Sequence, residues 1–473
     1  MQPEDSGGPT SEKKHGGAVS QLAIGLADWS ERWFPDALVF ALAAVAIVFI
    51  IGLCMGETPG HLTTDFGEGF WELSLFTMQM AMIIIGGYVV ATAPPVARVI
   101  GWLATIPRTA RGAVAFVAFV STTTSLLSWG FSLVFSALLV RRVVQKVQGV
   151  DYRAVSAAAY LGVGTVWALG LSSSAALMMA TRGSIPPAIF KISGLISLKH
   201  TVFTWQSMVT AVLLIVVSVL VAYLSAPAAS HAKTAEAFGV KFDLSAAPIS
   251  RSHVPGEWLE HNGLLTMVIC AIGFSYLIKT FVTRGPFAAL DLNTYNFLFL
   301  MLGMLLHWKP AAFARAVSAS VPATAGVLIQ FPFYAGIFGI ITKSSISNRI
   351  AEFFVRISSH DTYPVLIAIY SAIVGLFVPS GGSKWIIEAP YVLGAANQLH
   401  VNLGWVVQIY NTAEALPNLI NPFWMLPLLG LLHIRARDVV GYTALQLIVN
   451  IPLVLFLMWF FARTLPYVPP GAF

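Results

Sequence analysis

Residues 379–390 read PSGGSKWIIEAP and interrupt two long apolar stretches with glycine, serine and charge. Gly381 and Gly382 permit a tight turn whose backbone can approach a ligand closely. The turn also starts a new helical stretch, and the first N–H groups of a helix form a ready anion site. We therefore expect a re-entrant helical hairpin over 362–399, with a tip that suits a small carboxylate; a plain Pro-Gly loop is the alternative.

The composition indicates that this hairpin lies in a membrane. The chain of 473 residues is 57% hydrophobic and only 10% charged, whereas a soluble domain carries about 25% charged residues. A transmembrane helix needs about 20 mostly apolar residues, and many such stretches occur between short polar loops. The net charge of +6 is modest and lies in loops, so it does not indicate a nucleic-acid partner. The chain is predicted to be an all-α, multi-pass integral membrane protein.

The apolar stretches predict around nine transmembrane helices in addition to two hairpins. The polar residues 1–35 are expected to form a cytoplasmic segment, because the apolar run that follows is too long for a cleavable signal. Two amphipathic pieces are expected at 95–106 and 345–357. The expected uninterrupted helices cover 36–55, 70–92, 202–224, 263–282, 291–307, 318–341 and 438–462.

The other hairpin is predicted over 112–140. Basic residues flank this segment at both ends, whereas a simple span has one positive flank, since basic loops prefer the cytoplasm. Its middle reads STTTSLLSWG (121–130), and polar backbone at mid-membrane depth is tolerated only where it is buried in protein or lines a cavity. We expect three residues at this tip to bind substrate: Ser125, Ser128 and Trp129.

Segment 154–181 is predicted to be a broken helix, interrupted by GLSSSA at 170–175. Its serines are small donors beside a glycine hinge, and the break follows directly after a hairpin. We therefore expect Ser172, Ser173 and Ser174 to face substrate. The alternative is that these serines bond back to helix carbonyls.

Segment 404–432 is predicted to be a second broken helix, interrupted by NTAEALPNLINP at 411–422. Pro417 removes a backbone donor, and the prolines should unwind the helix. Freed carbonyls and polar side chains could then bind a substrate or coordinate a cation, while a kinked helix with satisfied amides is the alternative. The candidate substrate ligands here are Asn411, Thr412 and Asn418.

Three ionisable residues lie in these interrupted segments: Lys384, Glu388 and Glu414. Ionisable residues inside a membrane are costly and usually functional. One interpretation is that Lys384 binds the substrate carboxylate while Glu388 and Glu414 carry a coupling proton. The alternative is a self-neutralising ion pair between Lys384 and Glu388, which are four residues apart. The predicted substrate site at this hairpin tip comprises Ser380, Gly381, Gly382, Ser383 and Lys384.

The two halves of the chain repeat one order of elements. Gln79 and Gln330 are 251 positions apart, and a shift of 256 aligns the hairpins and places Trp129 on Trp385. The helix at 263–282 adds one crossing, which inverts the second half relative to the first. Inverted repeats with broken helices at the midplane are the build of many secondary transporters. The expected division is repeat 1 over 36–224, a polar linker over 225–261, a connecting transmembrane helix over 262–290 and repeat 2 over 291–465.

Six stretches together resemble the short-chain fatty acid transporter family: FTMQM (76–80), SWGFSLV (128–134), IQFPFYAGIFGI (329–340), FVPSGG (377–382), NPFWMLPLLG (421–430) and ARDVVGY (436–442). The resemblance runs from about residue 20 to the C-terminus. It implies uptake of short-chain carboxylates such as butyrate or acetoacetate across the bacterial inner membrane. The broader ion-transporter group, which also holds citrate and dicarboxylate carriers, implies a scaffold, a moving domain with an elevator-like shift, and a homodimer.

The chain departs from the family pattern at its charged residues. The pattern after the turn is close to GGGQW followed by Gln-Gly-Pro, whereas this chain has GGSKW and Glu388-Ala-Pro. A GDQWTN-like stretch is replaced by AEALPN at 413–418, which brings in Glu414. These departures leave open a hydroxy acid, keto acid or dicarboxylate as substrate.

Proton symport is favoured because Glu388 and Glu414 could titrate, and sodium coupling is the alternative. An anion channel is less favoured, because the chain has isolated breaks and no continuous polar pore. We expect no enzymatic activity, cofactor or bound metal, because no HExxH, GxSxG or Cys/His cluster occurs in the sequence.

Overall fold

The computed structural model describes residues 37–227, 232–240, 257–378, 380–421 and 423–471. The predicted cytoplasmic segment 1–35 and much of the predicted linker 225–261 lie outside these residues. Within the described part every regular element is a helix, which confirms the all-α prediction. Seven helical stretches there are long and apolar enough to cross a membrane: Ser74–Ala91, Ala110–Leu127, Tyr152–Ala180, Trp205–Ser225, Leu264–Arg284, Pro310–Lys343 and Ala436–Ala462.

Three further apolar helices are shorter, at Ala41–Cys54, Leu292–His307 and Tyr363–Leu376. Six of the seven correspond to expected transmembrane helices, and Ala110–Leu127 is an arm of the first hairpin. Of the three expected helices that remain, those at 36–55 and 291–307 are shorter than a span, and 404–432 is interrupted. The chain is a multi-pass membrane protein, as the composition predicts.

The N-terminal half follows the expected order, with helix ends close to the expected positions. Two short helices were not expected: α3 (Pro59–Gly69) and α10 (Pro187–Ser193). The α3 helix has a local start signal, because Thr58 accepts a hydrogen bond from the N–H of His61 and Pro59 occupies the first turn. The other helices of this half are α2 (Ala37–Cys54), α4 (Ser74–Ala91), α5 (Pro94–Leu103), α6 (Ala110–Leu127), α7 (Trp129–Lys146), α8 (Tyr152–Leu161), α9 (Ser174–Ala180) and α11 (Trp205–Ser225).

The C-terminal half also follows the expected order. The stretch expected at 318–341 starts earlier, as α16 (Pro310–Ser320), a 3-10 turn η6 (Val321–Thr324) and α17 (Ala325–Lys343). The longer helices of this half are α13 (Leu264–Arg284), α15 (Leu292–His307), α18 (Ile346–Ile357), α19 (Tyr363–Phe377), α20 (Gly381–Gln398), α21 (Leu403–Ala415), α22 (Leu426–Leu432) and α23 (Ala436–Ala462). Two short helices, α12 (Glu257–His261) and α14 (Pro286–Ala289), flank α13.

Each predicted hairpin is a pair of helices with a break at the expected tip. Ser128 separates α6 from α7, with extended backbone at φ −157° and ψ 120°. Its hydroxyl accepts a hydrogen bond from the N–H of Phe131, so Ser128 ends one helix and caps the next. Ser380 precedes α20 with similar backbone angles, but its side chain does not cap the helix.

Both predicted broken helices are broken at the expected places. After α8, the chain makes a π-helical turn η1 (Gly162–Val166) and a 3-10 turn η2 (Trp167–Leu169) before α9 begins at Ser174. Gly170 lies so close to the first hairpin that a Cβ there would be 2.2 Å from the carbonyl oxygen of Leu126. After α21, Pro417 lies in the 3-10 turn η7 (Leu416–Leu419), and a second such turn, η8 (Phe423–Met425), leads into α22.

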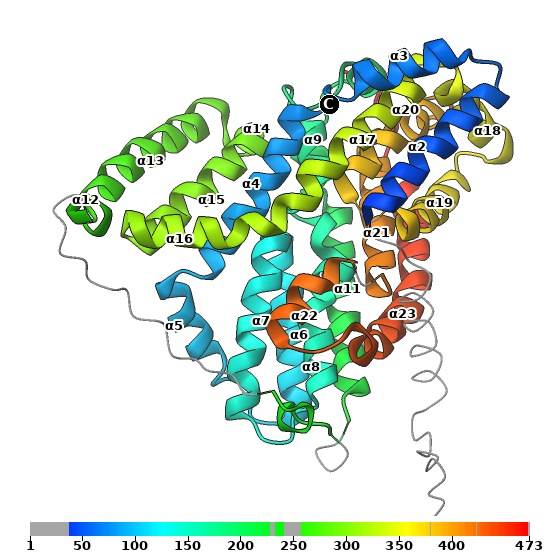
Figure 1. Cartoon of the computed structure of the whole chain (residues 1–473). Coiled ribbons are helices and arrows are strands. Elements are labelled where there is room, and N and C mark those ends of the chain that lie inside the picture. The colour runs from blue at the N-terminus through cyan, green and yellow to red at the C-terminus, as the bar shows by residue number, and fades with distance from the viewer. Residues whose placement is uncertain (1–36, 228–231, 241–256, 379, 422, 472–473) are drawn as a thin grey trace, which may run out of the picture.

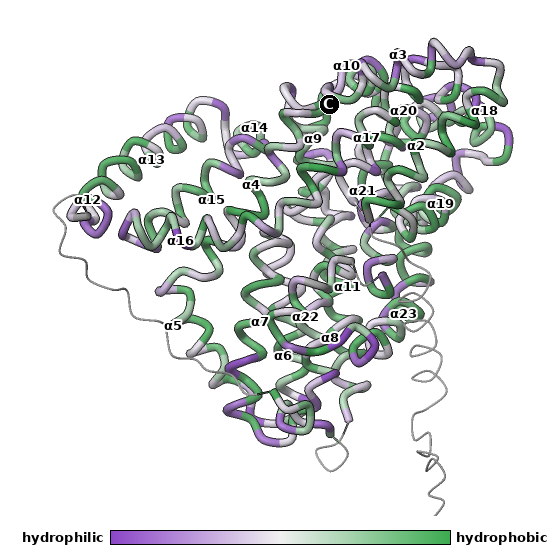
Figure 2. The backbone as a smooth tube through the Cα atoms, in the orientation of Figure 1, coloured by the Kyte–Doolittle hydropathy of each residue, from purple (hydrophilic) through white to green (hydrophobic). Residues whose placement is uncertain are grey.

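The arrangement in space separates an outer wing from a densely buried centre. Helices α12 to α16 form the wing at the left of Figure 1, whereas the hairpin α6–α7 and helices α8 and α11 descend through the middle. Helix α13 of the wing is mostly green in Figure 2, and Val282 on it is 78% exposed. In contrast, 94% of the most apolar window in Tyr152–Ala180 is buried. An exposed apolar helix in such a protein faces lipid, so the broken helix lies inside and the wing lies in contact with the bilayer.

Candidate functional site

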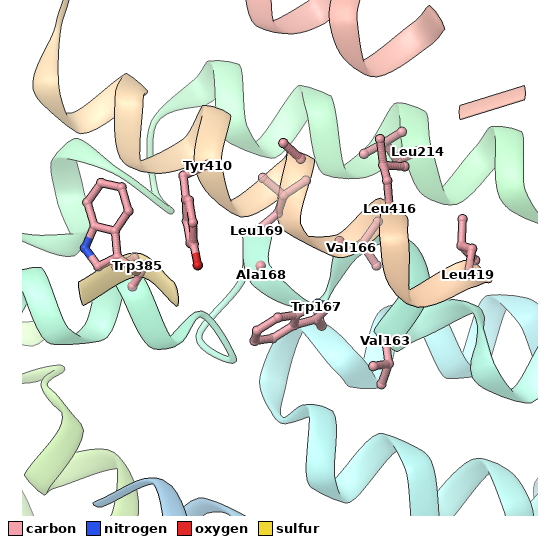
Figure 3. Close-up of a cluster of buried hydrophobic side chains, with 14 of the residues drawn as sticks. Val163, Val166, Trp167, Ala168, Leu169, Leu214, Trp385, Tyr410, Leu416 and Leu419 are labelled. Atoms are coloured by element: carbon pink, nitrogen blue, oxygen red, sulfur yellow. The ribbon is translucent and has the colours of Figure 1, made fainter. Parts of the chain in front are cut away.

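The two broken helices contact each other at their breaks. The Nδ2 group of Asn418 in η7 donates a hydrogen bond to the carbonyl oxygen of Val163 in η1, at 3.3 Å. A Cβ on Gly164 would lie 2.3 Å from the side chain of Leu419, so the backbone of the π-helical turn packs directly against η7. Figure 3 shows Val163 and Trp167 of the first break beside Leu416 and Leu419 of the second. The fold thus brings together the two segments that the sequence marks as unwound.

Each hairpin tip is hydrogen-bonded to the neighbouring broken helix. The N–H of Trp129 at the first tip donates to Ser172 Oγ at 2.6 Å. At the second tip, the hydroxyl of Tyr410 on α21 donates to the carbonyl oxygen of Gly381 at 2.8 Å, and Figure 3 shows Tyr410 beside Trp385. Both tips and both breaks therefore meet in one region.

A cavity lies where these four segments meet. It is partly open, and about 420 Å³ of space between atoms lies within it, part of which is open to solvent. Six of its lining residues are among the predicted substrate ligands and come from all four segments: Trp129, Ser174, Ser380, Gly381, Gly382 and Asn418. The other lining residues are Met80 of α4, Val163, Trp167, Val327 and Phe331 of α17, and Trp424.

The cavity is mainly apolar, with a few polar groups in its wall. Trp129 and Trp424 meet edge to face, with ring centroids 5.1 Å apart. Two buried wall atoms have no hydrogen-bond partner among the described residues: the acceptor Asn418 Oδ1 and the donor Trp167 Nε1. Gly381 and Gly382 begin helix α20, and the first N–H groups of a helix have no partner within it. An apolar pocket with a few convergent polar groups is typical of a small-molecule site.

Several predicted ligands do not line the cavity, because their polar groups bond within the protein. Ser125 donates to the Thr122 carbonyl at 2.8 Å, and Thr412 donates to the Gln408 carbonyl at 2.7 Å. Ser173 donates to Asn411 Oδ1 at 3.0 Å and so joins the two broken helices. The remaining residues of this group also have internal partners: Ser128 caps α7, Ser172 accepts from Trp129, and Ser383 bonds to Ser380.

Lys384 lies behind the cavity wall and binds two carboxylates. Its Nζ atom is 2.8 Å from Glu414 Oε2 and 3.4 Å from Glu388 Oε1, and it donates to the Ser371 carbonyl at 2.7 Å. The same atom lies 4.5 Å from the centre of the Tyr410 ring, an attractive cation–π arrangement. All three charged side chains are at most 1% exposed. The ion pair between Lys384 and Glu388 is therefore present, and Glu414 extends it to a cluster of one cation and two carboxylates.

Sequence reasoning missed two kinds of residue at this site. The first is the apolar wall from α4 and α17, notably Met80 and Phe331, although both lie in stretches that resemble the family. The second is Ser371, whose hydroxyl donates to Glu388 Oε2 at 2.6 Å. A single serine in the apolar run of α19 is a weak signal, since most such serines bond back to their own helix.

The family model for short chain fatty acid transporters matches residues 18–461 of the chain. The chain belongs to this family. A protein of Escherichia coli (strain K12), provisionally named a short-chain fatty acid transporter, is 36% identical over 429 residues, which cover 90% of this chain and 96% of that protein. A protein of Haemophilus influenzae (strain ATCC 51907 / DSM 11121 / KW20 / Rd) with the same provisional name is 31% identical over 452 residues, covering 93% and 100%. The resemblance seen in the sequence is thus confirmed: this is a membrane transporter and not an enzyme.

Two solved transporter structures share the fold. The YdaH transporter of Alcanivorax borkumensis has a TM-score of 0.55 and 15% identity, covering 92% of this chain and 100% of that one. MtrF of Neisseria gonorrhoeae, described as illuminating a class of antimetabolite efflux pumps, has a TM-score of 0.50 and 12% identity, covering 95% and 99%. At these identities the likeness concerns the fold alone. Among the described residues, no group of three or more His, Cys, Asp or Glu side chains is placed to hold a metal ion.

Proposed function

We propose that this transporter is a secondary active carrier for short-chain carboxylates such as butyrate or acetoacetate, acting in the bacterial inner membrane. The observation that carries the proposal is the cavity at which both hairpin tips and both helix breaks meet. Substrate that binds there contacts all four segments at once. Movement of these segments would therefore change the access of the bound substrate to the two sides of the membrane.

The start of α20 is the best place in the cavity for the carboxylate. Gly381 and Gly382 expose backbone at the first turn of this helix, and the Ser380 side chain does not cap it. Helix N-termini favour anions through free N–H groups and the helix dipole. A Cβ on Gly382 would lie 2.8 Å from the ring of Phe76, so no larger residue fits without rearrangement. The substrate anion would bind these N–H groups with Ser174 nearby.

The remaining wall suits a short hydrocarbon tail. Trp129, Trp424 and Phe331 supply apolar rings, and no basic side chain is among the described residues that line the cavity. A second carboxylate on the substrate would meet apolar surface without a counter-charge, which is costly. A monocarboxylate is therefore favoured over a dicarboxylate.

The proposed architecture is two inverted repeats that work as an elevator, with the division into domains that the sequence predicts. Packing in the two halves supports this proposal because it is reciprocal. Helix α6 of the first hairpin packs against α8 and α11, and α19 of the second packs against α21 and α23. In the same way α4 packs against α15, and α17 packs against α2. The hairpins and broken helices would form the moving part, and a homodimer would hold the scaffold still.

Proton symport is the proposed form of coupling, through Glu388 and Glu414. A buried charge is costly unless it is compensated, and Lys384 compensates only one of these two carboxylates. A proton on the other would make the cluster neutral. Sodium coupling would instead use carbonyl and hydroxyl oxygens at the breaks.

The test is transport by purified protein in liposomes. Uptake of radiolabelled butyrate should saturate, show counterflow, and rise when the outside is acidic relative to the inside. Trp129→Ala should reduce uptake by about tenfold or more, because it removes a wall of the cavity. Trp71→Ala, at a side chain that is 70% exposed, is the matched control and should transport normally. Non-saturable flux without counterflow would indicate a channel, and no butyrate uptake or binding would reject the proposed substrate class.

A further inference from the structure

The two carboxylates that share Lys384 differ in their surroundings. Glu388 lies on the same helix as Lys384, four residues further from the cavity. Its Oε2 accepts the Ser371 hydroxyl at 2.6 Å, which ties it to α19 of the same hairpin. Glu388 therefore has two stabilising partners, Lys384 and Ser371, both within one hairpin. Such partners favour a carboxylate that keeps its negative charge.

Glu414 belongs to a different element and lies directly behind the cavity wall. Its Cγ atom is 3.6 Å from the position that a Cβ on Gly381 would occupy, and Gly381 lines the cavity. Its Oε2 is 2.8 Å from Lys384 Nζ, while its Oε1 has no hydrogen-bond partner among the described residues. One glycine thus separates this carboxylate from the proposed substrate anion.

The titratable groups around Glu414 lie on helices α20 and α21. Helix α20 supplies Lys384 and Glu388, and Tyr410 on α21 itself lies within electrostatic range. Helix α19 faces Glu414 with Gly375, at which a Cβ would be 3.1 Å from Glu414 Oε2. Tyr363 and Tyr370 of α19 and Tyr391 of α20 interact with Glu388 instead. Lys384 is thus the cation that contacts Glu414, and it is shared with Glu388.

We propose that Glu414 takes up a proton when a carboxylate anion binds in the cavity, while Glu388 remains ionised as the lasting counter-ion of Lys384. The inference rests on the proposed function, because it concerns the same cavity. With both carboxylates ionised the cluster carries one net negative charge. A substrate anion that arrives behind only Gly381 would be repelled by this charge. One proton moves from bulk water to a Glu414 oxygen and forms a carboxylic acid, and no other bond changes.

The geometry allows Lys384 to stay charged through this step. Its ammonium group retains Glu388 and the Ser371 carbonyl as partners when Glu414 becomes neutral. When the substrate leaves, Glu414 returns the proton to water and pairs with Lys384 again. Proton and substrate are therefore linked by electrostatic repulsion, without direct contact between Glu414 and the substrate.

The experiment measures proton uptake on butyrate binding to the full-length protein in detergent. Calorimetry in two buffers of different ionisation enthalpy gives the number of protons that accompany each bound anion. Wild-type protein should take up a proton with the anion. Its affinity for butyrate should therefore rise as the pH falls, by up to about tenfold per pH unit. Glu414→Gln should bind butyrate without proton uptake and with a flat pH profile. Glu388→Asp keeps the negative charge beside Lys384 and should therefore keep the proton uptake.

Glu388→Asp leaves the net negative charge of the cluster unchanged, whereas Glu414→Gln removes that charge together with the proposed proton acceptor. Glu68→Gln, on an exposed side chain of α3, is the control for a remote carboxylate. Proton uptake that persists in Glu414→Gln, or that disappears in Glu388→Asp, would overturn the assignment. If wild-type protein binds no butyrate, the proposed function fails, which is a separate result.

Infrared difference spectra provide a second measurement on wild-type protein. Butyrate binding should produce a carbonyl band of a protonated carboxylic acid, and this band should shift in Glu414→Asp but not in Glu388→Asp. This readout decides the proposal even if Glu414→Gln does not fold. Absence of the band from wild-type protein with bound butyrate would contradict it.

Discussion

The two hairpin tips have similar backbone angles, but the first carries hydroxyl groups where the second carries charges. Ser128 and Ser380 each precede the second helix of their hairpin, 252 positions apart, so Ser132 corresponds to Lys384 and Ser136 to Glu388. The shift of 256 predicted from Trp129 and Trp385 is therefore wrong for the tips. In the first hairpin, the Ser128 hydroxyl caps α7, and Ser132 donates to the Ser121 carbonyl at 2.8 Å. In the second hairpin, Lys384 and Glu388 replace Ser132 and Ser136 with charged residues, and the helix start is left without a side-chain cap.

This difference shows how two similar halves can divide the work of one site. The first tip satisfies its own polar groups and supplies the Trp129 ring to the cavity. The second tip leaves backbone donors at its helix start and places an ion cluster behind them. The shape of the site thus depends on both halves, while its charge belongs to the second.

The largest expected effect follows from removal of the cation from the second hairpin. Lys384→Met leaves two buried carboxylates without a counter-charge, and breaking a buried ion pair costs about 3–5 kcal/mol. We expect a large fall in the unfolding temperature in detergent. At the first tip, Ser128→Ala should cost only about 1 kcal/mol, because it removes a helix cap. Equal falls in unfolding temperature for Lys384→Met and Ser128→Ala would contradict the assignment of the site's charge to the second hairpin.

The next effect concerns the space at the second tip. A Cβ on Gly381 would lie 2.5 Å from the Trp167 ring, so Gly381→Ala narrows the cavity beside the proposed anion site. Butyrate affinity should fall by about tenfold or more, as expected for lost contacts worth about 1.4 kcal/mol. Gly130→Ala at the first tip is the control, because its nearest contact would be an ordinary 3.5 Å. Unchanged affinity in Gly381→Ala would place the substrate elsewhere.

The third comparison concerns hydrogen bonds in the two hairpins, for which the expected difference in stability is about 0.5–2 kcal/mol. Ser371→Ala removes the donor to the Glu388 carboxylate, and a hydrogen bond to a charged group contributes about 1.5–3 kcal/mol. Ser132→Ala removes neutral hydrogen bonds and should cost about 1 kcal/mol. Denaturation in mixed micelles would measure both. A greater loss of unfolding free energy in Ser132→Ala than in Ser371→Ala would show that the Ser371 hydroxyl does not stabilise the Glu388 carboxylate.

The smallest effect is expected at an exposed ion pair between α3 and the last residue of the span Pro310–Lys343. Lys343 Nζ is 2.7 Å from Glu68 Oε2, and the Glu68 side chain is 63% exposed. The hydrogen bond from Lys343 lowers the pKa of Glu68. A lowered pKa contributes stability above the unfolded-state value, and this contribution is lost as the pH falls through the folded-state value. Because the pair is exposed, Glu68→Gln should leave the unfolding temperature unchanged within error at neutral pH. A clear fall would show that this exposed pair matters more than its surroundings suggest.

The sequence predicts the order of helices and the place of each break because both depend on local signals. Apolar length marks the spans, and clusters such as PSGGS and LSSS mark the interruptions. The short helices α3 and α10 were not predicted, since neither is long or apolar enough to resemble a span. The all-α class and the four segments at the cavity were therefore predictable.

The detailed wall of the site was not predictable in the same way. Phe331 and Trp424 lie in apolar runs, where a residue that faces a cavity has the same sequence pattern as one that faces lipid. Lys384 was expected to reach substrate, yet its donors are directed at Glu388, Glu414 and the Ser371 carbonyl. These contacts join helices α19, α20 and α21, and such long-range pairing leaves no periodic signal. The sequence indicated which residues are unusual, and only the fold showed which of them meet.

Gly375 has an evolutionary consequence. A methyl group at this position would stand 3.1 Å from the carboxylate of Glu414, which is closer than an alkyl group and a buried charge tolerate well. A lineage that replaces Gly375 would first have to shorten or neutralise residue 414. Among relatives, the two positions are therefore expected to change together, and Glu414 should be inherited only alongside glycine at 375.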